Sequence, residues 1–504
     1  MELVYPPTAR LSEEDKTSIC YLAFPDSNSG CMGDTRLRHS AHPSVVGGGG
    51  GLVAGHARYN KAAPVSLQAT PNYLYGFVYF RQVKDPNLPR GYFQKSVILL
   101  SRLPFVNLFL EVCGKVAPRF FRCGLSSLEE AWCNISKWPF PEPGESTCLS
   151  LLGEILNVQI PSDSSQCNIV LAQHTSGNTI SPVHLLNLFS CFSTCVYHIH
   201  LLWELVLTGE PIVVMGSSPE TCSQMVHALV SMIMPLRYCA EHRPYFTIHD
   251  SEFKEYTKTT HAPPPIILGV TNPFFSKTLQ HWPHIVKLAE PVNKAGVYTQ
   301  YEPFLHRDKA IVKKLLKGVA TNRPEEVQSA LLRRHLLELT QSFMIPLERY
   351  MGTLMPLHKN ISPYRAAPTP WPFDPDAFLA SLDKSGPQLT TGIRGNWVGL
   401  YRRFFRSPNF DGWYRCRYKA MSDKLQALQL ESLAAADLGH WVRDKQEVEV
   451  VDMLLRIRCR LQESSRHEGV PLSEEVRHRL RMRMDEIVCT LPEDLRTVLN
   501  SNTS

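Results

Sequence analysis

The 504-residue sequence lacks the motifs that mark the common classes of enzyme site. It has no GxxxxGK[ST] phosphate loop, no HExxH zinc motif, no GxSxG nucleophile elbow and no GxGxxG dinucleotide fingerprint. Its 14 cysteines form no CxxC pair, so no paired metal-ligand spacing is present. These absences argue against the enzyme classes that depend on those motifs.

A strong charge of either sign is also absent. The 53 basic and 47 acidic side chains leave a formal net charge of +6, which suits an acidic partner or a membrane surface. It is too small for a dedicated nucleic-acid surface. The first residues, MELVYPPTAR, show neither the basic region nor the apolar region of a secretory signal. We therefore expect a cytoplasmic protein with reduced cysteines.

One uncharged run, from Val183 to Trp203, is long enough to span a bilayer. It contains three histidines, an asparagine and several hydroxyl side chains, which are unfavourable in hydrocarbon. A buried helix is the favoured interpretation, and no transmembrane segment is expected.

Glycine- and proline-rich stretches divide the chain into segments of different periodicity. Residues 1–133 form an upstream module in which 1–33 and 70–112 contain strand-like runs such as YLYGFVYFRQV and FQKSVILLSRL. The module also holds a glycine-rich insert at 39–69, which we expect to be flexible and without a packed core. A proline-rich linker follows at 134–147. Helix and strand patterns alternate over 148–292, which predicts an α/β module with a mainly parallel sheet. Residues 300–500 repeat apolar positions at helical spacing, so this region is predicted to be α-helical.

Local signals place several elements within the α/β module. A helix should end near Gly209, and a second helix should start at a capping box of Ser217 and Glu220, with Pro219 in its first turn. A third should begin at Pro273 with Asn272 as its cap. Strands are expected at 211–215, 244–250, 264–270 and 284–290.

The run His249-Asp250-Ser251 contains the side-chain types of a hydrolase triad. In a strand, His249 and Ser251 would share one face and Asp250 would point away. A triad needs a line of hydrogen bonds from serine through histidine to aspartate. We therefore expect no catalytic residue here, and a serine hydrolase remains only a distant alternative.

Two strand-to-helix turns, VVMGSSPE and LGVTNP, place helix N-termini beside the ends of predicted strands. Such turns can bind phosphate. Helix capping alone explains their serine, asparagine and proline residues and is the favoured interpretation.

A cluster of basic and aromatic residues occupies 395–419. Its arginines Arg402, Arg403 and Arg406 form a candidate patch for an acidic partner or a membrane. Single-stranded nucleic acid is a weaker alternative. The helical spacing of Trp397, Tyr401 and Phe404 more simply predicts one buried aromatic face.

Six long motifs resemble the DENN-domain family, and most closely its class-six members. They are RGYFQKSVILLSRLP (90–104), LLWELVLTGEPIVVM (201–215), RPYFTIHDSEFKEY (243–256), ILGVTNPFFSKTLQHWPH (267–284), LELTQSFMIPLERY (337–350) and SPNFDGWYR (407–415). The resemblance implies an upstream longin-like α/β module, a core DENN α/β module and a helical downstream region.

The resemblance also implies guanine-nucleotide exchange on a Rab GTPase in its GDP-bound or nucleotide-free state. For class-six members the implied GTPases are Rab fourteen and, to a lesser degree, Rab thirty-five, on recycling endosomes with peripheral membrane contact. This function needs no catalytic side chain, metal or cofactor. A noncatalytic adaptor that binds a Rab or a membrane is the alternative. If the segment around the HDS run lies near the GTPase, the candidate contact residues are Phe246, His249, Asp250, Phe253 and Asn272.

The chain departs from the family pattern in its upstream module. Relatives carry a strand before the segment corresponding to ELVYPP, and strand-forming sequence where this chain has HSAHPSVVGGGGGLVAGHARYN (39–60). A glycine run pairs poorly in a sheet. We therefore expect an incomplete upstream module with an exposed sheet edge.

Overall fold

The computed structural model describes most of the chain and divides it into two compact units. The first unit comprises residues 1–344 and 383–412, and the second comprises 345–382 and 413–504. Within them, the described residues are 1–9, 11–25, 32–41, 54–64, 67–69, 74–162, 179–180, 187–250, 252–288, 296–382, 387, 393–465, 472–493 and 495–496.

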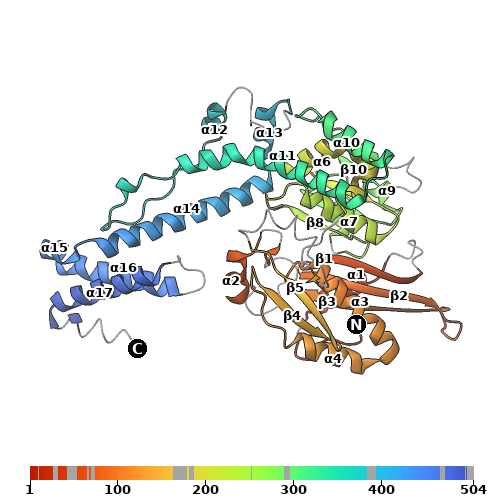
Figure 1. Ribbon diagram of the computed structural model, residues 1–504, viewed down its shortest axis with the longest axis horizontal. Coiled ribbons are helices and arrows are strands. Elements are labelled where there is room, and N and C mark those ends of the chain that lie inside the picture. The colour runs from red at the N-terminus through yellow and green to blue at the C-terminus, as the bar shows by residue number, and fades with distance from the viewer. Residues whose placement is uncertain are drawn as a thin grey trace. The chain divides into compact units, whose positions relative to one another are not determined.

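The first unit opens with two three-stranded sheets (Figure 1). Both sheets contribute to one apolar core. One sheet is antiparallel, in the order β1-β2-β3; the other has the order β4-β5-β6. The predicted strand-like runs of residues 70–112 form β2 and β3, which confirms them, whereas the expectation of strands within 1–33 is wrong for Glu13–Leu22, which form helix α1. The elements are α1 Glu13–Leu22, β1 Gly33–Ala41, α2 Ala54–Ala62, β2 Leu74–Lys84, β3 Tyr92–Ser101, α3 Val106–Cys123, α4 Leu125–Ile135, β4 Ser146–Leu151, β5 Glu154–Gln159 and β6 Thr179–Ile180.

The expectation that the insert at 39–69 has no packed core is wrong for the described part of that range. Strand β1 continues to Ala41, paired with Leu74 of β2. Helix α2 then buries Tyr59 against Phe105, with ring centroids 6.0 Å apart, and Leu67 is buried in the same core. Although the segment is rich in alanine and glycine, Tyr59 and Leu67 supply large apolar side chains that pack it against the upstream core. Residues 42–53, which hold the glycine run, lie outside the described residues.

The core of the first unit is a five-stranded sheet in the order β11-β10-β7-β9-β8. Strands β10, β7, β9 and β8 are parallel to one another, and β11 pairs antiparallel with β10. The sheet is therefore mainly parallel, as predicted. The elements are α5 Leu188–Phe192, the 3-10 helix Ser193–His198, α6 Ile199–Leu207, β7 Ile212–Met215, α7 Pro219–Ser231, β8 Glu241–Arg243, α8 Phe253–Tyr256, β9 Ile266–Val270, α9 Phe275–Thr278, β10 His284–Lys287 and β11 Gly296–Thr299.

Most local signals in this core are confirmed. Helix α6 ends before Gly209, whose φ of +67° suits glycine. Helix α7 begins at Pro219, but its cap is Ser218, whose Oγ accepts from the backbone N–H of Thr221 at 3.2 Å. The predicted Ser217 cap is thus one residue out of place, because two serines precede the proline and only the second reaches the first turn.

The uncharged run that ends at Trp203 does not form one continuous helix. Among its described residues, α5, a 3-10 helix and α6 follow one another, with non-helical φ and ψ at Cys195. In the part of the chain that the structure describes, no helix is long and apolar enough to cross a membrane. Leu202 and Trp203 are buried in the first unit, as expected for a core helix.

The later chain is helical, as its periodicity predicts. The second unit has its own core, which includes Leu438, Ile457, Leu480 and Ile487. The remaining elements are α10 Lys309–Ala320, α11 Glu325–Thr353, the 3-10 helix His358–Asn360, α12 Pro375–Ser381, α13 Trp397–Phe404, α14 Pro408–Ala435, α15 Leu438–Arg443, α16 Glu447–Ser465 and α17 Glu474–Thr490.

Candidate functional site

The segment after β8 forms a turn and not the predicted strand over 244–250. Strand β8 ends at Arg243. A carboxylate oxygen of Asp250 accepts from the backbone N–H of Thr247 at 2.7 Å and from its hydroxyl at 3.1 Å. The residues from Pro244 to Thr247 are all buried, so the apparent alternation does not correspond to two faces. The aspartate side chain closes a turn, and this local hydrogen bonding replaces the ladder of a strand.

A buried arginine lies among acidic side chains beside this turn. The Arg243 guanidinium is 2.5 Å from a carboxylate oxygen of Glu241 and 3.4 Å from one of Glu252. Burial raises the pKa of Asp250 to about 6, although hydrogen bonds from Thr247 and the charge of Arg243 lower it. Because the carboxylate ionises as the pH rises through about 6, its burial makes folding less favourable at neutral pH than at pH 4.

His249 projects from the turn to helix α1. Its ring stacks on that of Tyr21, with centroids 4.3 Å apart and planes 13° apart. Nearby, the Tyr245 hydroxyl lies 3.4 Å from the carbonyl oxygen of Phe24, and the buried Tyr245 packs with Leu22. The turn after β8 is therefore a junction between the upstream module and the core. The Asp250 carboxylate accepts hydrogen bonds from Thr247 and not from His249, so these two side chains do not form the aspartate–histidine pair of a triad. Ser251 lies outside the described residues.

The turn after β9 contacts the segment after β8 through Phe253 and presents an aromatic side chain. The Asn272 side chain accepts from the backbone N–H of Phe274 at 3.0 Å, which supports capping in place of phosphate binding. The helix itself is shorter than predicted and covers only Phe275–Thr278. Phe274 is 49% exposed and lies 6.2 Å from the ring of the half-buried Phe253.

The five predicted contact residues thus all come from the segments that follow β8 and β9, but they are not equally available. Phe246 is completely buried against Phe275, so it does not fit a direct contact with a partner. Sequence reasoning missed the exposed Tyr21 and Phe274. The NPFF run follows a buried strand, but its sequence does not say which of its two phenylalanines is exposed.

We call the exposed group at this end of the sheet the junction rim. Its apolar members come from both the upstream module and the core, and His249 lies among them. The junction rim consists of Tyr21, Phe24, Ile248, His249 and Phe274.

The basic patch predicted on α13 is only partly available. Helix α13 buries Trp397, Tyr401 and Phe404, which confirms the aromatic face. The Arg403 guanidinium lies 2.7 Å from a carboxylate oxygen of Glu210, so its charge is paired. Burial would raise the pKa of Glu210, but hydrogen bonds from His284 and Arg403 outweigh it and lower this pKa. Arg402 and Arg406 are exposed.

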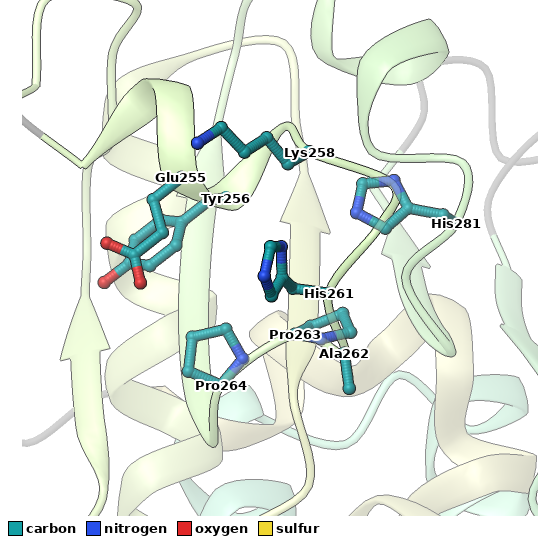
Figure 2. Close-up of a pocket in the computed structure, with 8 residues that line it drawn as sticks. All are labelled: Glu255, Tyr256, Lys258, His261, Ala262, Pro263, Pro264 and His281. Atoms are coloured by element: carbon teal, nitrogen blue, oxygen red, sulfur yellow. The ribbon is translucent and has the colours of Figure 1, made fainter.

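A separate pocket of about 470 Å³ opens at the amino-terminal ends of β9 and β10. Figure 2 shows His261 between the Glu255 side of the pocket and His281. No cluster of three or more metal-ligating side chains was found among the described residues. The residues that line the pocket are Glu255, Tyr256, Lys258, His261, Ala262, Pro263, Pro264 and His281. The pocket therefore lies at the opposite end of β9 and β10 from the junction rim.

Comparison with known proteins matches two domains of this chain. The family model for the DENN (AEX-3) domain covers residues 92–287, and that for the DENND6 C-terminal domain covers residues 438–502. The chain is 49% identical to protein DENND6B of Mus musculus over 529 residues, which cover 99% of this chain and 90% of the relative. It is 46% identical to protein DENND6A of Gallus gallus, with the same coverage of each chain. It is 30% identical to the protein DENND6 homolog of Dictyostelium discoideum over 90% of this chain and 74% of the relative.

Proposed function

Because the chain belongs to the DENND6 family of DENN-domain proteins, we propose that it is a guanine-nucleotide exchange factor for Rab fourteen and, more weakly, for Rab thirty-five. Family membership implies that the chain regulates a Rab GTPase by promoting nucleotide exchange. The two named GTPases, a cytoplasmic location and recruitment to recycling endosomes are the finer parts of the proposal.

The junction rim is the observation that supports a GTPase-binding surface. Aromatic side chains that become buried at the centre of an interface supply much of the binding energy of protein complexes. Tyr21 and Phe274 are large, partly exposed and held by packed neighbours, so ordering them on binding has a small entropic cost. His249 and Asn272 add polar groups beside them.

Exchange by such a surface requires no nucleophile, acid or base. The protein would bind the GTPase most tightly in the conformation whose switch regions and magnesium no longer hold GDP. Each ~1.4 kcal/mol of preference for that conformation speeds release about tenfold. In this mechanism the junction rim supplies binding energy, and the hydrogen bonds from Thr247 to the Asp250 carboxylate position the turn that carries His249.

Release of fluorescent GDP from purified Rab fourteen and Rab thirty-five tests the proposal. We expect release to accelerate with the concentration of this protein, and faster for Rab fourteen. Binding to GDP-loaded or nucleotide-free Rab without acceleration would instead support an adaptor. No binding to either nucleotide state of these Rabs would contradict the choice of partner.

A further inference from the structure

The hairpin of β2 and β3 extends beyond the third strand of its sheet (Figure 1). Strand β1 pairs with β2 only as far as Gly33 opposite Gln82. Strands β2 and β3 continue to pair up to Lys84 opposite Tyr92. We call residues 83–92, VKDPNLPRGY, the hairpin tip.

The backbone of the hairpin tip is held by its own hydrogen bonds. The N–H of Leu88 donates to the carbonyl of Asp85 at 3.2 Å, and the N–H of Gly91 donates to the carbonyl of Leu88 at 2.8 Å. The Asp85 carboxylate accepts from the backbone N–H of Asn87 at 3.0 Å. Gly91 has a φ of +70°, which favours glycine. The tip therefore presents its side chains from a defined loop, so little conformational entropy is lost when they bind.

Apart from Asn87, the exposed side chains of the hairpin tip are apolar or basic. Val83, Leu88 and Tyr92 are exposed, and Tyr92 is 40% exposed. Lys84 and Arg90 are exposed between them. Asp85 is the only acidic residue of the tip. Apolar side chains with neighbouring cations, together with a tyrosine, are the composition that binds the interface of an anionic membrane.

The cations at the base of the hairpin differ from those at its tip. Arg81 pairs with Asp34 at 2.6 Å and lies over the Phe121 ring. Lys95 pairs with Glu2 at 2.8 Å. These ion pairs neutralise the base, so the excess positive charge is found where the apolar side chains are exposed.

We propose that the hairpin tip inserts into an anionic lipid surface, with Leu88 and Tyr92 in the interface and with Lys84 and Arg90 against lipid headgroups. A protruding loop that carries apolar side chains matches a flat lipid surface. The inference goes beyond nucleotide exchange and does not depend on it, because lipid binding by this tip requires no GTPase.

Vesicle sedimentation of the full chain provides the first test. Vesicles of phosphatidylcholine with phosphatidylserine are compared with phosphatidylcholine alone. Leu88→Glu/Tyr92→Glu should lower the partition coefficient by roughly tenfold or more, because two apolar contacts become charged. Lys84→Glu/Arg90→Glu should weaken binding mainly to the anionic vesicles and reduce its dependence on salt. The control Ile155→Glu changes a side chain that is 69% exposed on β5 and should leave binding unchanged.

Tryptophan fluorescence provides a second test that does not depend on loss of binding. Tyr92→Trp should add a blue-shifted signal when anionic vesicles are present, whereas Tyr298→Trp on β11 should not. Circular dichroism and thermal unfolding establish that each variant is folded. GDP release from a soluble GTPase without vesicles should be the same in Leu88→Glu/Tyr92→Glu as in the unmodified chain, which separates this proposal from the proposed function.

Three outcomes would overturn the proposal. They are no binding of the unmodified chain to anionic vesicles, unchanged binding of the tip variants, and loss of binding in Arg402→Glu/Arg406→Glu with the tip variants unaffected. The last outcome would place the membrane contact on α13.

Discussion

A single buried side chain, Glu204, holds the segment that follows the core sheet. Glu204 on α6 is completely buried, and its two carboxylate oxygens accept from the backbone N–H groups of Phe304 and Leu305, each at 2.8 Å. The Tyr301 hydroxyl lies 3.1 Å from the same carboxylate. Burial raises the pKa of Glu204 to about 7, while these hydrogen bonds lower it. One carboxylate therefore fixes the segment that leads from the core sheet to α10.

Replacing Glu204 should destabilise the first unit. Glu204→Gln keeps the shape but turns one acceptor into a donor that faces backbone N–H groups. We expect a loss of roughly 2–4 kcal/mol in the free energy of unfolding, because a buried donor and the groups facing it lose their partners. Urea unfolding measures the loss, and Glu129→Gln on the exposed face of α4 is the matched control. Equal stability of the two variants would contradict this role.

The junction rim leads to a second prediction for a single side chain. Phe274→Ser should weaken binding to nucleotide-free Rab by about tenfold or more, because a partly exposed aromatic anchor is lost at an interface. Tyr298→Ser is the control, since Tyr298 on β11 is 52% exposed and Phe274 is 49% exposed. Binding is measured by titration calorimetry, and thermal unfolding should change little in either variant. Equal affinities would remove Phe274 from the interface.

Packing between α6 and α11 depends on a pair of histidines. The Nε2 atoms of His200 and His335 are 3.0 Å apart, and both side chains are buried. Burial and the neighbouring His335 lower the pKa of His200 to about 4, with Asp308 raising it and Arg307 lowering it. Burial also lowers the pKa of His335, opposed by Asp308 and Glu338. The pair is thus neutral in the folded protein at pH 7.

This pair predicts a loss of stability in acid. A lowered folded-state pKa means that the stabilising contribution is complete above about 6.5 and is lost as the pH falls through about 4. For His200 the loss amounts to about 3 kcal/mol. The raised pKa of Glu204 has the opposite sign, with stability lost as the pH rises from about 4.5 through 7. Only a comparison between variants therefore isolates the histidines.

The measurement is the free energy of unfolding against pH for the unmodified chain and for His200→Phe/His335→Leu. Between pH 6.5 and 4 the double variant should lose less stability than the unmodified chain. The control Leu125→Ala, which changes an exposed and non-titratable side chain on α4, should show the unmodified pH dependence. Parallel curves for the double variant and the unmodified chain would show that the pair does not titrate in this range.

At the scale of the molecule, the upstream module contacts the core through β1, which lies against α7 and β8, and through a small buried contact of α1. Leu22 of α1 and Tyr245 are both buried and pack together, and the exposed stack of Tyr21 on His249 lies beside them. Because the junction rim draws side chains from both modules, its geometry depends on this contact.

Weakening that contact should loosen the junction without unfolding the core sheet. Leu22→Ala should destabilise the packing of α1 by roughly 2–5 kcal/mol, as expected for a truncated buried leucine. Hydrogen exchange should become faster in α1 and in residues 244–250, and Rab binding should weaken. Leu125→Ala, at an exposed position on α4, is the control. Unchanged exchange in both segments would show that the modules are coupled elsewhere.

Much of the fold could be predicted from the sequence because it is encoded in local patterns. The buried strands Ile212–Met215 and Ile266–Val270 are continuous apolar runs between turn residues. Helix α13 buries its aromatic residues because Trp397, Tyr401 and Phe404 recur at helical spacing. Family membership was predictable for a similar reason, since its motifs are long and contiguous.

Tertiary structure alone decided the features that depend on a partner distant in the chain. The segment after β8 resembles a strand by its alternation, yet Asp250 closes it into a turn beside the buried charge of Arg243. Arg403 was expected on a free basic surface, but Glu210 pairs with it from 193 residues away. Tyr21 and His249 are neighbours only because the fold stacks their rings. The periodicity of a sequence predicts which side of a helix or strand is apolar. The partner of a polar or aromatic side chain depends instead on which segments the fold brings together.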